Sequence, residues 1–210
     1  MNEVPQDIPS PVDFHSVEAA QAWAKEAEQK LPSRLEFFNF FVAELTLGQP
    51  HTVLELGSGP GFLAEYILTR CPFIHHYALL DFSGPMIEMS RKRLDAFDDR
   101  ISFHRVDFKQ PHWTDLVVGG PYEAIVTIQA VHELRHKRYA TAFYSDCKKL
   151  IRENGIILIC DRVPQDDSER DRALFMTAEE QIVALTQAGF GDPVIRVRTN
   201  ERVACRAVRL

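Results

Sequence analysis

The chain has 210 residues, 45% of them hydrophobic and 26% charged, a balance typical of one globular domain with a buried core. Its formal net charge of −6 argues against a large nucleic-acid surface, because phosphate binding needs clustered lysine and arginine. No run approaches the roughly 18 consecutive apolar residues of a membrane span. The start, "MNEVPQDIPSPVDF", lacks the basic and apolar regions of a signal peptide.

The four cysteines are scattered and include no C-x-x-C pair. Cys160 and Cys205 lie in apolar runs, where buried free thiols are expected. Without a secretion signal, free thiols indicate a reducing compartment, so a cytoplasmic location is expected.

Residues 1–47 predict an irregular arm followed by a helical lid that belongs to the same domain as the rest. The arm covers 1–15, and helical composition then continues to about residue 47 with an interruption at Pro32. Two helices are therefore expected, the second rich in phenylalanine. Aromatic side chains of this size are costly to expose, so most should pack against the sheet or its helices. One or two aromatic residues of the lid, Trp23 of the first helix among the candidates, could cover the acceptor site.

From residue 51 to the end, short apolar runs alternate with helical segments. The runs are "TVLEL", "HYALLD", "ISFHRVD", "EAIVTIQ" and "GIILICD". This alternation predicts β-α-β units and a parallel sheet covered by helices on both faces. The segment "HKRYATAFYSDCKKLIREN" is expected to be the helix before the fifth run.

The last 35 residues predict a capped helix and a hairpin. Thr177 and Glu180 form a capping-box pattern, and Gly189 is placed to end that helix. The runs "PVIRVRT" and "RVACRAVRL" then pair as an antiparallel hairpin at the sheet edge. The expected fold is α/β, a doubly wound, mostly parallel seven-stranded Rossmann-like sheet with an antiparallel C-terminal strand.

The first apolar run leads into "VLELGSGPGF", a strand, a glycine-rich turn and the start of a helix. This arrangement lets a backbone approach a nucleotide closely, although a tight turn without a ligand is the alternative. The glycines are spaced G-x-G-x-G, and the third glycine of a dinucleotide fingerprint is replaced by Phe62. Glu55, two residues before Gly57, disfavours a pyrophosphate and suits a ligand with an ammonium group.

These segments resemble the class I (Rossmann-like) S-adenosylmethionine-dependent methyltransferases. "VLELGSGPG" resembles the first motif of that family, and "LLDFSGPMIEMSRKRL", "ISFHRVDF", "EAIVTIQAVHEL", "LIRENGIILICD" and "LTQAGF" resemble the next five in order. The resemblance covers about residues 51–208. It implies S-adenosylmethionine as cofactor, S-adenosylhomocysteine as product, and residues 48–210 as the domain that binds them.

The adenosine part of this cofactor has candidate contacts after the second and third runs. Asp81 ends the second run, where a carboxylate can accept both ribose hydroxyls. A helix cap is the alternative role, but Ser83 already supplies a capping side chain. The resemblance implies that Phe82 and Met86 contact adenine, that Asp107 accepts its amine and that Phe108 flanks the ring. The residues expected to hold the methionine part and the reacting methyl are Glu55, Gly57, Ser58, Gly59, Gly61 and Gln129.

The stretch "AVHELRH" contains H-E-x-x-H, a zinc-hydrolase pattern when both histidines share a helix. Here it follows a strand-like run, so no metal site is expected and the zinc hydrolase is the weaker alternative. The carboxyl end of the fourth strand faces the reaction crevice in such folds. His132 and Glu133 are therefore candidates for a general base. An equally weighted alternative is that His132 only lines the pocket. His136 is the less favoured candidate.

The function expected is methyl transfer to a small molecule, because no DNA-methyltransferase Asn-Pro-Pro-Tyr motif or catalytic-cysteine loop is present. A donor-binding module without catalysis stays open. Neither a nucleic-acid nor a membrane partner is expected. The lid and the segments 130–138 and 162–176 should choose the acceptor, and Arg34 could reach the carboxylate of the donor.

Overall fold

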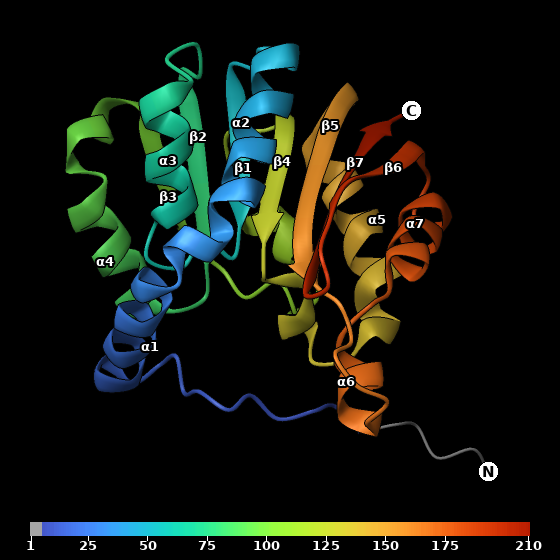
Figure 1. The fold of residues 1–210 in the computed structure, drawn as a ribbon. Coiled ribbons are helices and arrows are strands. Elements are labelled where there is room, and N and C mark those ends of the chain that lie inside the picture. The colour runs from blue at the N-terminus through green and yellow to red at the C-terminus, as the bar shows by residue number, and fades with distance from the viewer. Residues whose placement is uncertain (1–5) are drawn as a thin grey trace.

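The computed structural model describes residues 6–210 and contains one seven-stranded sheet in the order β3-β2-β1-β4-β5-β7-β6 (Figure 1). The strands are β1 Thr52–Leu56, β2 His76–Asp81, β3 Ile101–Arg105, β4 Tyr122–Ile128, β5 Ile151–Arg162, β6 Phe190–Arg198 and β7 Arg202–Arg209. The first five run parallel, and β7 is antiparallel to both β5 and β6. The expected fold class, including the C-terminal hairpin, is confirmed.

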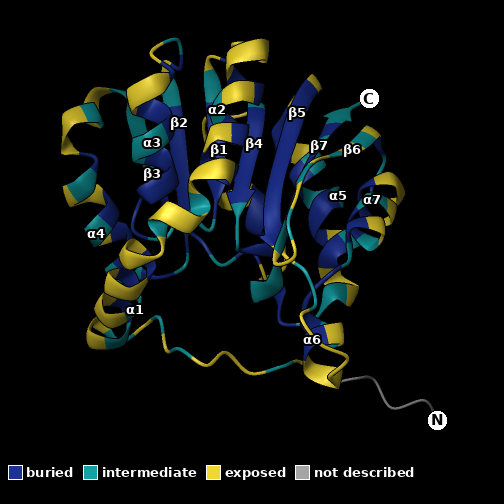
Figure 2. Cartoon of the chain, in the orientation of Figure 1, coloured by how far each residue is buried: buried dark blue, intermediate teal, exposed yellow. Residues whose placement is uncertain are grey.

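Helices cover both faces of the sheet, so its central strands are buried (Figure 2). The α-helices are α1 Val17–Gln29, α2 Leu35–Gly48, α3 Phe62–Arg70, α4 Gly84–Arg93, α5 Ala140–Leu150, α6 Glu169–Leu174 and α7 Ala178–Gln187. Short 3-10 helices are η1 Leu31–Arg34, η2 Asp95–Arg100, η3 Trp113–Leu116, η4 Val131–Leu134 and η5 Lys137–Tyr139. One core lies under α2 and α3, and a second under α5 and α7.

The caps of α7 agree with the sequence prediction, whereas the boundary between α5 and β5 does not. Thr177 Oγ1 accepts a bond from the Glu180 amide at 3.2 Å, and the Glu180 carboxylate accepts one from the Thr177 amide at 2.9 Å. Gly189 follows with φ +83°. The expected α5 helix is too long, because Ile151 already pairs with Tyr122 as the first residue of β5.

The amino-terminal arm crosses the carboxyl end of the sheet (Figure 1). Residues 6–15 are irregular as expected, while residues 1–5 of the expected arm lie outside the described residues. The Ile8 amide donates to the Arg135 carbonyl at 3.0 Å, and Ser83 Oγ donates to the Phe14 carbonyl at 2.6 Å. The arm is thus tied to the segment after β4 and to the start of α4. Within 6–210, no helix has the length and apolar character needed to cross a bilayer.

Candidate active site

The glycine turn after β1 places backbone close to its neighbours. Gly57 has φ +66°, and a Cβ there would lie 2.4 Å from the Cβ of Ala130. Gly61 has φ +82° and starts α3, where a Cβ would lie 2.6 Å from Ser90 Oγ. Both positions therefore need glycine for conformation and for space. The Gly59 amide donates to Asp81 Oδ2 at 2.8 Å, which joins the turn to the end of β2.

Asp81 is 7% exposed and accepts one backbone bond on each oxygen. Burial raises the pKa of Asp81 to about 6, although amide donors, among them those of Ser83 and Gly59, act in the opposite direction. Ser83 caps α4 by accepting from the Met86 amide at 3.2 Å, as the sequence suggested. Asp81 is therefore not needed as the cap, and its remaining lone pairs are available to hydroxyl donors.

A cavity of about 540 Å³ lies at the carboxyl ends of the strands, within the size range of small-molecule sites. The predicted site residues that line it are Gly57, Gly59, Asp81, Phe82, Met86, Phe108, Gln129, His132 and Glu133. The predicted site residues outside its lining are Glu55, Ser58, Gly61 and Asp107. The structure thus brings nine of the predicted positions together around one space.

Aromatic rings from the arm and from α1 cover the donor side of this cavity. The Phe14 ring packs edge-on against Trp23 at 5.6 Å and against Phe82 at 6.2 Å between centroids. Trp23 was among the expected roof candidates, whereas Phe14 was not recognised because the arm carried no helical or strand pattern. The phenylalanines of α2 are buried in the core instead: Phe37, Phe38, Phe40 and Phe41.

Glu55 points away from the cavity and into the core. It is 1% exposed, and its Oε2 accepts a hydrogen bond from the Tyr77 hydroxyl at 2.8 Å. Burial raises the pKa of Glu55 to about 8, with the charge of Asp81 adding to the effect and the Tyr77 bond opposing it. The Glu55 carboxyl is therefore largely protonated at neutral pH. Asp107, also outside the lining, accepts from the Lys109 amide at 2.9 Å.

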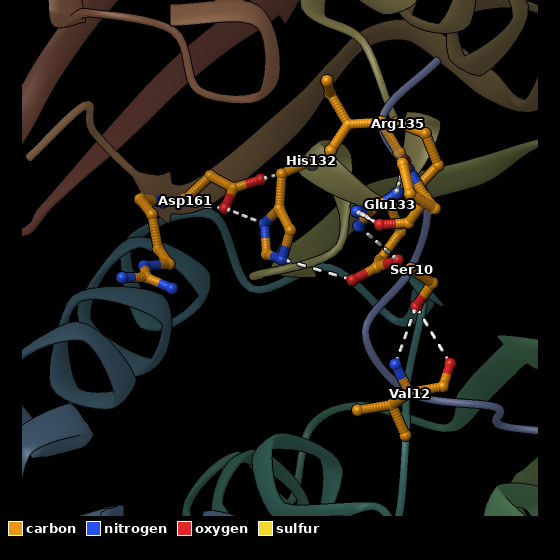
Figure 3. Close-up of polar contacts among 9 residues, drawn as sticks. Ser10, Val12, His132, Glu133, Arg135 and Asp161 are labelled. Atoms are coloured by element: carbon orange, nitrogen blue, oxygen red, sulfur yellow. Dashed lines mark hydrogen bonds and ion pairs between the residues drawn. The ribbon is translucent and has the colours of Figure 1, made fainter. Parts of the chain in front are cut away.

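His132, on η4 immediately after β4, lies between two carboxylates (Figure 3). Its Nδ1 is 2.6 Å from Asp161 Oδ1, and its Nε2 is 3.4 Å from Glu133 Oε1. Burial lowers the pKa of His132, but the charges and hydrogen bonds of Asp161 and Glu133 outweigh burial and raise it to about 9. Asp161 also accepts the His132 backbone amide at 3.0 Å, so one carboxylate sets both the position and the orientation of the ring.

Asp161 was missed at the sequence level. It lies near the end of β5 and is 6% exposed. The available signal was the one used for Asp81, an acidic residue at the carboxyl end of an apolar run. Glu133, on the other side of the ring, is held by Arg135 at 3.1 Å. Burial raises the pKa of Glu133, but the bonds and charges of His132 and Arg135 lower it overall.

The H-E-x-x-H pattern does not form the helix that a zinc site requires. The 3-10 helix η4 ends at Leu134, and Arg135 follows with the left-handed φ of +67°. His136 then begins a separate turn, in which its Nδ1 accepts from the Arg138 amide at 3.1 Å. The two histidines are therefore not on one helical face, and the hydrolase alternative loses its geometric basis.

Comparisons with known sequences and structures identify the kind of domain. A family model described as a methyltransferase domain matches residues 53–155. The family model and the structural neighbours are those of class I S-adenosylmethionine-dependent methyltransferases. The matched residues run from β1 to the first part of β5 and so include the glycine turn, Asp81 and His132.

Known proteins similar to this methyltransferase differ in size and in what surrounds the domain. A highly reducing polyketide synthase of Emericella nidulans is 24% identical over 116 residues, which are 52% of this chain and 4% of that protein. An O-methyltransferase family protein from Burkholderia thailandensis aligns with TM-score 0.72 and 16% identity, over 93% of this chain and 61% of that one. Human N-acetylserotonin methyltransferase, solved with S-adenosylmethionine, aligns with TM-score 0.71 and 13% identity. That alignment covers 93% of this chain and 57% of the human one. The structural alignments cover more of this chain than the family model does. The chain nevertheless spans only a small part of the length of its curated relatives.

Proposed function

We propose that this methyltransferase transfers a methyl group from S-adenosylmethionine to a small molecule, and that His132 removes a proton from the acceptor. The single observation that carries the proposal is the His132–Asp161 pair, in which Asp161 orients an imidazole that lines the same cavity as the predicted donor residues. A buried imidazole oriented by a carboxylate is an arrangement suited to general base catalysis. The enclosed size of the cavity supports a small acceptor.

The donor side of the cavity fits the cofactor of the family. Each Asp81 oxygen already holds one backbone donor and keeps lone pairs for a ribose hydroxyl. Phe82, Met86 and Phe108 provide the apolar surface that an adenine ring requires. When bound, S-adenosylmethionine supplies an electrophilic methyl group. The contribution of the chain is then to align the acceptor with that methyl and to exclude water.

Removal of a proton requires His132 in its neutral form. With a pKa of about 9, the His132 ring is mainly protonated at neutral pH when no cationic ligand is bound in the cavity. A positive charge placed in the cavity lowers this pKa, because like charges disfavour the imidazolium. Asp161 holds Nδ1 at 2.6 Å, so Nε2, which lies 3.4 Å from Glu133 Oε1, is the nitrogen assigned to accept the proton. The acceptor atom that benefits is one that must lose a proton, such as a hydroxyl.

Two substitutions test the donor and base roles separately. Asp81→Ala should weaken binding of S-adenosylhomocysteine at least about tenfold, because two charge-assisted hydrogen bonds are lost. His132→Gln should bind it as the wild type does. Isothermal titration calorimetry measures both. Absence of binding by the wild type at millimolar concentration would refute the proposal.

Product formation is followed with S-adenosylmethionine that carries a deuterated methyl group, added to a protein-free extract of small metabolites. Mass spectrometry should find labelled products with the wild type and none with His132→Gln. Equal labelling by the two proteins would remove His132 from the reaction. A parallel reaction contains cellular protein and RNA, and label found there but not in the metabolite extract would contradict the small-molecule acceptor.

A further inference from the structure

The part of the cavity beyond His132 carries positive charge. Arg162 is the last residue of β5 and Arg202 the first of β7, and the two are register partners across the antiparallel pair. Cross-strand partners present their side chains on the same face of a sheet. Arg34, at the end of η1, also lines the cavity and lies within reach of the charge of Arg202. Lys30 is a further lining residue, and Glu201 is the only lining carboxylate outside the Asp81 and His132 regions among residues 6–210.

The guanidinium groups of this region are incompletely paired. Arg202 has a side chain that is 13% exposed and pairs with the exposed Glu201 at 3.0 Å, but its Nε is buried without a partner. The Nε of Arg34 is also buried and unpartnered. Burial, followed by the nearby charge of Arg202, lowers the pKa of Arg34. At the mouth, Arg162 forms no ion pair within residues 6–210. An anion would satisfy donors that the chain leaves open.

The position of these groups relates them to the acceptor and not to the donor. The residues that fit the donor follow β1, β2 and β3, while Arg162 and Arg202 lie on β5 and β7, beyond β4. Phe175 connects the two halves, because its ring centroid is 5.4 Å from that of His132 and 5.0 Å from Arg162 Cζ. A molecule whose reacting atom is at His132 can therefore place its other end on the arginines.

Resting on the proposed function, we propose that the methyl acceptor is an anion whose carboxylate or phosphate group binds Arg162 and Arg202. Planar guanidinium groups match such oxyanions with paired hydrogen bonds. The other source of a carboxylate is the methionine part of the donor, for which Arg34 is the sequence candidate. Lys30 already pairs with Glu26, and Arg202 pairs with Glu201 through one nitrogen only. A donor carboxylate at Arg34 therefore leaves Arg162 and the buried Nε of Arg202 for the acceptor.

The experiment compares the wild type with Arg202→Gln, with Arg198→Gln as the matched control. Arg198 is an exposed strand residue outside the cavity lining, and it forms an ion pair with the exposed Glu179. Each protein is titrated with S-adenosylhomocysteine and with 5′-methylthioadenosine, which lacks the amino-acid part. Each is then saturated with S-adenosylhomocysteine and titrated with benzoate, phenylacetate, 4-hydroxybenzoate and phenyl phosphate, and with their carboxamides or phenol as neutral partners.

The wild type and Arg198→Gln should bind at least one anion about tenfold more tightly than its neutral partner. Arg202→Gln should reduce that ratio to near one while its affinity for S-adenosylhomocysteine stays within about twofold. Equal binding of every anion and its neutral partner by the wild type would overturn the inference. So would an Arg202→Gln variant that loses S-adenosylhomocysteine but keeps 5′-methylthioadenosine, since the arginine would then hold the donor. Failure of the wild type to bind S-adenosylhomocysteine refutes the proposed function instead.

Discussion

Glu55→Gln tests whether the acidic residue before the glycine turn binds the cofactor or belongs to the core. The substitution removes the ionisable group but keeps an oxygen that can accept the Tyr77 hydroxyl. Because Glu55 is 1% exposed, its neutral form is the one that the folded protein favours. Glutamine imitates that form at every pH, so the difference between the two proteins reports the ionisation of Glu55.

The expected size follows from the pKa of about 8 in the folded protein and the ordinary value of 4.5. The raised pKa contributes stability that is complete below pH 4.5 and is lost as the pH rises through 8. At about 1.4 kcal/mol per unit, ionisation destabilises the wild type by up to about 5 kcal/mol above pH 8. Between pH 6 and pH 8.5, Glu55→Gln should therefore gain about 3 kcal/mol relative to the wild type.

Urea unfolding followed by circular dichroism at these two pH values measures the free energy of unfolding of each protein. Glu36→Gln, at an exposed position on α2, should change that free energy by less than about 0.5 kcal/mol at either pH. A difference between Glu55→Gln and the wild type that does not change with pH would refute the buried, protonated state. A tenfold loss of affinity for S-adenosylhomocysteine in Glu55→Gln would restore the ammonium contact that the sequence suggested.

Two further substitutions examine the turn and the base. Gly57→Ala should lower the free energy of unfolding, measured by urea titration, by about 2–4 kcal/mol, because the new Cβ meets Ala130 and the φ is positive. Gly59→Ala is the control: its φ is also positive but its Cβ has open space, so the loss should be only about 1 kcal/mol. Equal losses would show that the contact is not the cause. Asp161→Asn should lower the pKa of His132 from about 9, because the negative charge that stabilises the imidazolium is removed. NMR titration of the His132 ring measures this pKa, and an unchanged value would contradict the assigned pairing.

The fold, and the meeting of nine predicted site residues around one cavity, could be predicted because they depend on local patterns. Apolar runs ending in Asp81, and glycines following β1, are signals contained within a few residues of one another. The direction of Glu55 could not be predicted in the same way. A strand that is buried on both faces has no alternation of apolar and polar residues. The sequence of β1 therefore does not reveal whether the Glu55 side chain points toward the cavity or toward Tyr77.

The acceptor side was harder to predict because its residues are far apart in sequence. Arg202 reaches the cavity only through the antiparallel register of β7 with β5, which the sequence of either strand does not specify. Phe14 lies in a segment without regular structure, and its position depends on bonds from Ser83 and on packing against Trp23. Such contacts are decided by tertiary structure alone.

The cavity wall is drawn from two separate parts of the chain. The family match, residues 53–155, includes the glycine turn, Asp81 and Phe108, whereas Trp23, Arg34, Arg162 and Arg202 lie outside it. Under the proposed acceptor site, substitutions at Arg162 and Arg202 should therefore alter which acceptor is selected without changing Asp81 or Phe108, whereas Trp23 and Arg34 also lie on the side assigned to the donor. Arg162 and Arg202 are therefore the natural targets for redirecting this methyltransferase by design, and the first positions to compare when related chains are examined for altered substrate choice.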